Sequence, residues 1–238
     1  MATYNGEQFI EKQVLSILSQ LSKIDELIIV DDCSSDNTIN ILKDINDSRI
    51  KIHKNHENMG HVLSFCKSVS FAKNKYIFLS DQDDIWIDGR VNLMIQNIVE
   101  DDSILLTSNF KWIDENDNPI EVLYDGVDQK DSKKYLKNVL DIFIGKTNYF
   151  GCAMVFKQEL TSVISPTPKF VESHDLWVAL AANILKSNRH INAKTFLKRR
   201  HSSNATSTHS SRPVWKKLYS RIIFLLSIFV IYKRKLIN

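Results

Sequence analysis

The chain has 238 residues, of which 43% are hydrophobic, and contains only 6 glycines and 4 prolines. This composition fits one substantial core with an appendage and excludes a disordered or fibrous chain. The net charge of +3 conceals a division: residues 176–238 hold 13 Lys or Arg and no acidic residue, whereas residues 1–175 hold 18 Lys or Arg and all 28 acidic residues. We therefore expect the C-terminal part to face something anionic, such as a phosphorylated ligand, nucleic acid or a membrane surface.

Apolar runs alternate along the chain with segments of helical periodicity. Helices are predicted at 6–21, 34–45, 61–73 and 174–185, and strands at 26–32, 49–55, 75–81, 103–114 and 151–156. The β-branched runs at 26–32 and 75–81 are typical of parallel strands buried on both faces. The alternating order predicts a doubly wound α/β sheet, followed by a Ser-rich linker at 199–213.

The predicted sheet lacks a full first strand. Met1 stands only one or two residues before TYNGE, which is typical of the loop that enters the first helix. In doubly wound sheets the first strand lies near the middle, so its absence would leave backbone groups unpaired. We expect a truncated first strand and a natural start roughly 5 residues upstream.

The cysteines and the N-terminus indicate the compartment. Cys33, Cys66 and Cys152 are far apart and form no C-x-x-C spacing, so neither a disulfide framework nor a zinc site is expected. The start MATYNGEQFI has neither the basic residues nor the apolar segment of a signal peptide. We expect a cytoplasmic protein.

Carboxylates follow two predicted strands: Asp31 and Asp32 after the first, and Asp81, Asp83 and Asp84 after the other. In an extended segment, positions i and i+2 project to the same side, so Asp81 and Asp83 can face one point while Gln82 faces away. A divalent cation with oxygen ligands would neutralise them. The alternative is that both clusters are solvated helix caps, with Asp84 capping the segment near Trp86.

Four stretches carry a family resemblance: ATYNGEQFIEKQVLSILSQ, LIIVDDCSSDNT, YIFLSDQDDIW and SHDLWVAL. In this order they resemble the motifs of family 2 glycosyltransferases of the GT-A fold, particularly bacterial enzymes of surface-polysaccharide synthesis, including rhamnosyltransferases. The resemblance covers residues 1 to about 205 and implies a GT-A mixed sheet. The Q-x-x-R-W motif of processive synthases is absent, which indicates non-processive transfer.

The resemblance implies a nucleotide site. Thr3 and Tyr4 match a loop that lines the nucleotide pocket, and Asp32 matches the residue that accepts a hydrogen bond from the base of a UDP- or dTDP-sugar. His201, in the basic stretch KRRHSSNAT, matches a histidine that returns over the diphosphate, and Arg199 or Arg200 would lie near the phosphates. The alternative for His201 is a surface position in a linker.

The resemblance also implies a metal site and a base. Asp81 and Asp83 match the D-x-D motif that holds Mn²⁺ or Mg²⁺, with Asp83 touching the metal and His201 as a further candidate ligand. Asp175 matches the base that removes the acceptor hydroxyl proton in an inverting displacement. From the residues alone, Asp175 could equally be a helix cap next to His174.

The C-terminal segment combines apolar and basic residues. Ile222 to Tyr232 is an apolar stretch of 11 residues interrupted only by Ser227, well short of the ~20 needed to span a bilayer. Basic residues flank it on both sides, which favours a helix lying on an anionic membrane surface. The alternative is a helix that packs on the sheet or on a second subunit. We expect a catalytic unit at 1–205 and this tail at 206–238.

The sequence thus predicts an inverting, metal-dependent glycosyltransferase, cytoplasmic or peripheral on the inner face of the membrane. Its expected partners are a nucleotide-diphosphate sugar, a glycan or glycolipid acceptor and a membrane surface, with no nucleic acid; an oligomer is not excluded. Two alternatives remain: a catalytically silent nucleotide-sugar binding or scaffold subunit, and a nucleotidyltransferase, which would release pyrophosphate.

Overall fold

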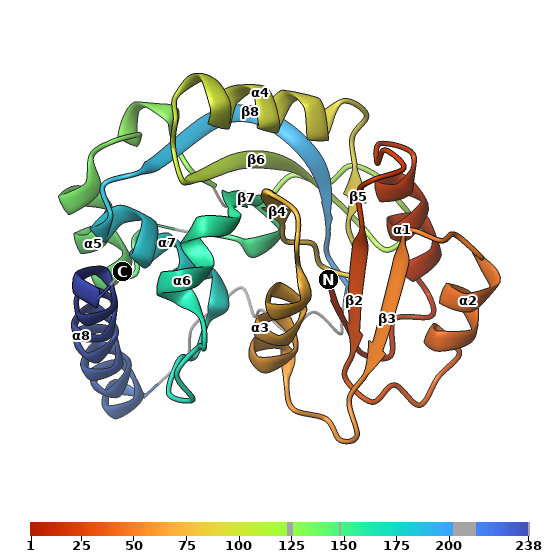
Figure 1. The fold of residues 1–238 in the computed structure, drawn as a ribbon, viewed down its shortest axis with the longest axis horizontal. Helices are drawn as coiled ribbons and strands as arrows, with labels where there is room; N and C mark the ends of the chain where they lie inside the picture. Colours follow the sequence, from red (N-terminus) through yellow and green to blue (C-terminus); the bar gives the residue numbers. More distant parts are fainter. Residues whose placement is uncertain (123–125, 148, 202–212, 238) are drawn as a thin grey trace.

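The computed structural model describes residues 1–122, 126–147, 149–201 and 213–237. It is a mixed α/β structure with one three-stranded and one five-stranded sheet (Figure 1). Helices cover the sheets, and the last helix, α8, lies at the opposite edge of the molecule from the three-stranded sheet.

The three-stranded sheet has the order β1-β2-β3, and its strands are parallel. Its strands are β1 (Ala2–Thr3), β2 (Leu27–Asp31) and β3 (Ile50–Lys54), and they alternate along the chain with α1 (Ile10–Leu18), α2 (Thr38–Asp44) and α3 (His61–Phe71). Every residue of β2 is buried, as its β-branched run predicts. The predicted alternation of helices and strands is confirmed for this part of the chain.

The first strand is present but has only two residues. Ala2 pairs with Val30 and Thr3 with Asp31, so β1 occupies the edge of the parallel sheet next to β2. The Met1 ammonium donates a hydrogen bond to the Ile28 carbonyl at 2.8 Å. Burial lowers the pKa of this ammonium to about 5.

The five-stranded sheet has the order β4-β7-β6-β8-β5. Its strands are β4 (Tyr76–Phe78), β5 (Ile85–Trp86), β6 (Leu105–Ile113), β7 (Met154–Lys157) and β8 (Asn188–Arg199). Only β6 and β8 pair in parallel; β4 pairs antiparallel with β7, so the expectation of a parallel strand at 75–81 was wrong. Helix α4 (Arg90–Glu100) lies over β6 and β8 in Figure 1.

The rest of the chain is mainly helical. It contains η1 (Gln129–Asp131), α5 (Tyr135–Ile144), η2 (Gly151–Ala153), η3 (Gln158–Leu160), α6 (Thr161–Ile164), α7 (His174–Ile184) and α8 (Val214–Ile237). The largest buried cluster joins Phe156, Leu160 and Trp177 to Ile231 of α8, so the last helix packs on the body of the fold. Most of the predicted linker, residues 202–212, lies outside the described residues.

Candidate active site

Residues from four regions of the chain gather where β2, β4 and β8 end and α7 begins. The loop after β1 is tied to the loop after β4 through Gln82. Its amide oxygen accepts hydrogen bonds from Thr3 Oγ1 at 2.6 Å and from the Tyr4 amide at 2.8 Å, and its amide nitrogen donates to the Tyr4 carbonyl at 3.1 Å. A Cβ at Gly6 would lie 2.5 Å from the same oxygen, so a side chain there would displace the Gln82 amide. Gln82 therefore fixes the predicted nucleotide loop, whereas Asp81 and Asp83 contact Lys198 and His201.

Asp32 is buried at the end of β2 and already holds a loop. Its Oδ1 accepts from the Met59 amide at 2.8 Å and from Asn55 Nδ2 at 2.9 Å, and its Oδ2 accepts from the Gly60 amide at 2.8 Å. Gly60 has a φ of 84°, a conformation that favours glycine. A carboxylate has about four lone-pair sites, so Oδ2 retains capacity for one more donor. The contact of Asp32 with the base of a nucleotide stays a prediction.

A second group of acids surrounds a lysine. Ligand atoms of Asp81, Asp84 and Cys152 all lie within 4.8 Å of one another. The Lys198 ammonium, on β8, is 3.3 Å from Asp81 Oδ2, 4.0 Å from Asp84 Oδ2 and 3.4 Å from the Cys152 sulfur. The Lys198 side chain is only 12% exposed. A positive charge of the protein itself thus sits among these acids.

The charges of this group depend on one another. Burial raises the pKa of Asp84 to about 7, although the nearby Lys198 ammonium acts in the opposite direction. Burial alone would lower the pKa of Lys198, but the Asp84 carboxylate and its neighbours outweigh burial and raise it well above the ordinary value. Burial also raises the pKa of the Cys152 thiol well above its usual value. Lys198 is therefore charged, whereas Cys152 is a protonated thiol.

Asp83 and His201 meet although they are 118 residues apart in the sequence. His201 Nε2 lies 2.8 Å from Asp83 Oδ2, and the imidazole ring is 4.8 Å from the Phe9 ring. Both side chains are partly accessible. The structure thus brings together two of the three predicted metal ligands, and Asp81 lies two residues from Asp83 on the same loop.

The two arginines after β8 differ in their surroundings. Arg199 is fully buried: its backbone amide donates to Asp84 Oδ1 at 3.0 Å, and its guanidinium donates to the Asp83 carbonyl at 2.7 Å and pairs with Asp117 at 2.6 Å. Arg199 therefore fixes the acidic loop. Arg200 is exposed, and its backbone amide donates to the Ile113 carbonyl. Of the two, Arg200 is the more exposed residue.

Asp175 lies in the first turn of α7 and is 23% exposed. The N-cap of this helix is Ser173, whose hydroxyl accepts from the Leu176 amide at 3.2 Å, so Asp175 is not the cap. Instead, its Oδ1 lies 2.5 Å from His174 Nε2. Burial alone would raise the pKa of Asp175, but His174 and the Gly151 amide lower it. Asp175 is therefore ionised at neutral pH and held by a neighbouring imidazole.

The turn η2 connects the Asp175 pair with the acidic group. A Cβ at Gly151 would lie 2.8 Å from both Asp175 Oδ1 and His174 Nε2, while the next residue, Cys152, contacts Lys198. Burial alone would lower the pKa of His174, but the Asp175 carboxylate outweighs burial and raises it. The Asp175 pair and the Asp81 group thus share one wall, formed by Gly151 and Cys152, and a side chain at position 151 would displace the pair.

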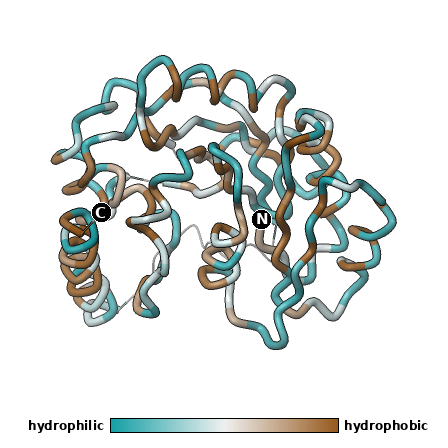
Figure 2. The backbone as a smooth tube through the Cα atoms, in the orientation of Figure 1, coloured by the Kyte–Doolittle hydropathy of each residue, from teal (hydrophilic) through white to brown (hydrophobic). Residues whose placement is uncertain are grey.

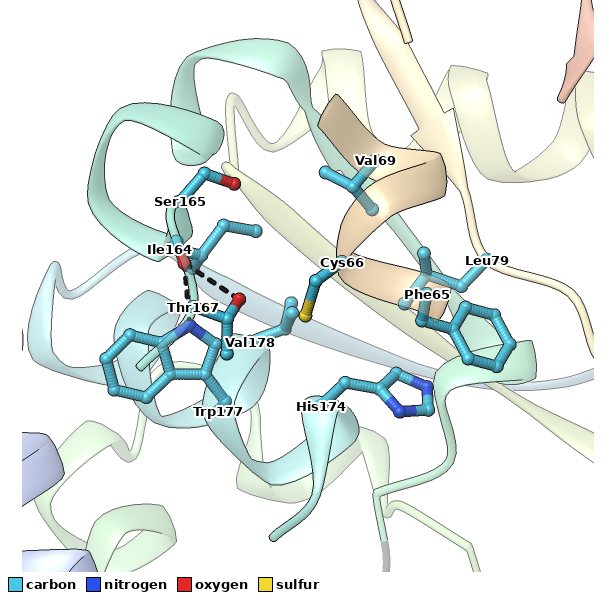
Figure 3. A pocket seen from close by; sticks show the side chains of 10 residues that line it. All are labelled: Phe65, Cys66, Val69, Leu79, Ile164, Ser165, Thr167, His174, Trp177 and Val178. Atoms are coloured by element: carbon cyan, nitrogen blue, oxygen red, sulfur yellow. Dashed lines mark hydrogen bonds between the residues drawn. The ribbon is translucent and has the colours of Figure 1, made fainter. Parts of the chain in front are cut away.

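A small cavity of about 20 Å³ adjoins this wall between α3, α6 and α7 (Figure 3). Its lining is mostly apolar: Phe65, Cys66, Val69, Leu79, Ile164, Ser165, Thr167, His174, Trp177 and Val178. The His174 ring stacks on Phe65 with 4.1 Å between centroids, and Trp177 Nε1 donates to the Ile164 carbonyl at 3.0 Å. This packing holds the imidazole that pairs with Asp175.

Two groups of side chains could hold a hard divalent cation, and the Asp83 and His201 pair suits it better than the group of Asp81, Asp84 and Cys152. Asp83 and His201 offer a carboxylate oxygen and an imidazole nitrogen directed at each other, a donor set that Mn²⁺ accepts and Mg²⁺ can share. The Asp81, Asp84 and Cys152 group includes a buried thiol and already contains an ammonium. The Asp83 and His201 arrangement therefore suits the predicted Mn²⁺ or Mg²⁺ better than the Asp81, Asp84 and Cys152 group does.

Comparisons with known proteins agree with this description. The family model of glycosyl transferase family 2 matches residues 1–164. WfgD of Escherichia coli, a UDP-Glc:α-D-GlcNAc-diphosphoundecaprenol β-1,3-glucosyltransferase, is 29% identical over 165 residues, which are 67% of this chain and 64% of WfgD. RfbG of Shigella flexneri, a dTDP-rhamnosyl transferase, is 35% identical over 116 residues, covering 46% of this chain and 40% of RfbG. The chain thus spans less than two thirds of the length of these relatives.

A solved structure shares the fold. Residues 1–349 of S. aureus TarS in complex with UDP-GlcNAc superpose with a TM-score of 0.70 at 18% identity, covering 94% of this chain and 65% of TarS 1–349. The curled mixed sheet is therefore the predicted GT-A fold. Because the family model covers more than half of the sequence, this chain belongs to glycosyl transferase family 2.

Proposed function

We propose that the protein transfers a sugar from a nucleotide-diphosphate donor to a hydroxyl of a surface-glycan acceptor, with inversion at the anomeric carbon. The observation that carries the proposal is the His174 and Asp175 pair, which Gly151 and Cys152 place beside the Asp81 group. Family membership supplies the reaction class. The activities of WfgD and RfbG support a UDP- or dTDP-sugar as donor, and that of WfgD supports a lipid-linked acceptor.

In the proposed reaction Asp175 takes the proton of the acceptor hydroxyl. The oxygen then forms a bond to the anomeric carbon on the face opposite the nucleotide, while the bond from that carbon to the diphosphate oxygen breaks and its electron pair stays on the diphosphate. Because His174 lowers the pKa of Asp175, the carboxylate is unprotonated before the reaction, as a base must be. The His174 imidazole nitrogen lies 2.5 Å from the carboxylate oxygen.

The rest of the site would bind the donor. Asp83 and His201, with Asp81, would hold Mn²⁺ or Mg²⁺, whose charge would stabilise the leaving diphosphate. Thr3 and Tyr4, fixed by Gln82, would line the nucleotide, Asp32 would accept from the base, and Arg200 would approach the phosphates. Lys198 adds a positive charge of the protein next to Asp81. Residues 1–205 form the proposed catalytic unit, acting in the cytoplasm or at the inner membrane face.

Identification of the released product tests this proposal against both alternatives. The chain is incubated with UDP- and dTDP-sugars, Mn²⁺ or Mg²⁺ and a lipid-linked acceptor, and the products are separated by chromatography. We expect a nucleoside diphosphate. Pyrophosphate would indicate a nucleotidyltransferase, and donor binding with no product from any donor would indicate a silent binding subunit.

A further inference from the structure

Helix α8 is attached to the fold by one face. Ile223, Ser227 and Ile231 recur every four residues and are buried, and Ile231 belongs to the main core cluster. Arg234 donates to the Val163 carbonyl at 2.7 Å, and Ser220 donates to Glu172 at 2.8 Å. The C-terminal helix thus packs on the body of the fold, as the alternative to a membrane-bound tail predicted. This packing determines which face of the helix points outward.

The outward face is also apolar. Ten large hydrophobic side chains on α8 are between 47% and 85% exposed: Trp215, Leu218, Tyr219, Ile222, Leu225, Leu226, Phe229, Tyr232, Leu236 and Ile237. Figure 2 shows hydrophobic residues along much of the helix. Leu218, Ile222, Leu225, Phe229, Tyr232 and Leu236 follow one another at steps of four, three, four, three and four, so they form one stripe. We call this set the outer stripe of α8.

The outer stripe is long and continuous. At 1.5 Å per residue, its span from Leu218 to Leu236 is about 27 Å. Soluble monomers rarely expose contiguous apolar patches of more than a few hundred Å², and larger ones mark interaction surfaces. Among the described residues no helix combines the length and apolar content needed to cross a bilayer. A partner that covers the stripe along its side is therefore required.

Charge identifies the partner. The described flanks of the stripe carry Lys216, Arg221, Lys233 and Lys235, and residues 176–238 contain no acidic side chain. A second copy of the chain on this face would bring two basic helices together, and nothing acidic on them would compensate. An anionic lipid surface offers both apolar chains and negative charge. Trp215, Tyr219 and Tyr232 add the aromatic side chains that favour the interface.

We propose that α8 lies in the surface of an anionic membrane with its outer stripe among the acyl chains and its basic residues at the headgroups. This inference names the surface that the proposed lipid-linked acceptor requires, and so it builds on the proposed function. Because the inner face of α8 packs on α6 and α7, the catalytic domain would be held against the membrane.

Co-sedimentation of the full chain with vesicles tests the proposal. Vesicles of equal parts phosphatidylcholine and phosphatidylglycerol are compared with phosphatidylcholine alone, at low and high salt. We expect binding to the anionic vesicles, weakened by salt. The double variant L225Q/F229Q should bind them at least about tenfold more weakly, because two apolar side chains lose their burial. Equal binding of this variant and the wild type would overturn the proposal.

A matched control variant shows whether the loss of vesicle binding is specific to the outer stripe. L136Q changes an exposed leucine on α5, outside the outer stripe, and should leave vesicle binding unchanged. Circular dichroism confirms that each variant is folded. Dimerisation without vesicles that L225Q/F229Q abolishes would overturn the proposal in favour of a second copy as partner. Donor turnover by the wild type without vesicles is measured separately, so failure of the proposed function and failure of membrane binding are distinguishable.

Discussion

Substitution of Lys198 by methionine should destabilise the protein in a pH-dependent way. Methionine keeps a long unbranched side chain but removes the ammonium that lies 3.3 Å from Asp81 and 4.0 Å from Asp84. Asp84 is buried, and its Oδ2 has no hydrogen-bond partner among the described residues, so Lys198 is its main compensation. Removal of one partner from a buried charge pair costs roughly 3–5 kcal/mol.

The pH dependence follows from Asp84. Its pKa in the folded protein is raised to about 7 from 3.8, so ionisation costs stability that is lost as the pH rises between these values. A shift of about 3 units corresponds to roughly 4 kcal/mol. Without Lys198 the folded pKa rises further, because its lowering effect disappears. The cost of the substitution should therefore be larger at about pH 8 than at about pH 5.5, where Asp84 is protonated in both proteins.

Urea denaturation in the presence of EDTA, at both pH values, measures this difference. Lys194→Met, on the same strand but exposed, is the matched control and should change the free energy of unfolding by less than about 0.5 kcal/mol. Two results would refute the role assigned to the ammonium. One is a destabilisation by Lys198→Met that is the same at both pH values, and the other is a destabilisation below about 1 kcal/mol at about pH 8.

Three further predictions concern the site itself. Gly151→Ala places a Cβ 2.8 Å from both Asp175 and His174, so kcat should fall at least about tenfold while the donor Kd stays the same. An unchanged kcat would contradict the proposal that Gly151 leaves the space in which this pair is positioned. Gln82→Ala removes its hydrogen bonds to the loop that contains Thr3 and should weaken donor binding in calorimetry roughly tenfold, whereas undiminished affinity would speak against that loop as nucleotide site. His174→Gln removes the imidazole that lowers the pKa of Asp175, so the acidic limb of the pH profile of kcat/KM should move to higher pH; a limb that stays in place would rule out Asp175 as its source.

The parallel part of the fold could be predicted because its signals are local. The apolar run of β2 and the helical spacing of α1 identify these elements without tertiary information. Strand β8 was missed because NRHINAKTFLKR is rich in polar and charged residues and contains a register shift near Asn109 of the neighbouring strand. The apolar stretch within 222–232 indicated a short helix, whereas α8 continues through the flanking basic residues.

The site was predictable where a motif fixed the residue and not where a distant partner decides its role. Asp83 and His201 were both named from motifs, and the structure brings them together. Lys198 was missed, since a lysine in a basic run is normally solvated, and only folding places it among acids more than 100 residues away. The contacts of Gln82 with Thr3 and Tyr4 were also missed, because its partners lie 78 and 79 residues away in the sequence.

Asp175→Asn removes the proposed base for sugar transfer while keeping the size of the side chain. Transfer to acceptor is measured by chromatography, and donor affinity by calorimetry, for the wild type and the variant under the same metal conditions. We predict a loss of kcat of about 10²–10⁴-fold with an unchanged donor Kd, because only the proton acceptor is removed. A variant that binds donor and transfers sugar at the wild-type rate would show that Asp175 is not the base.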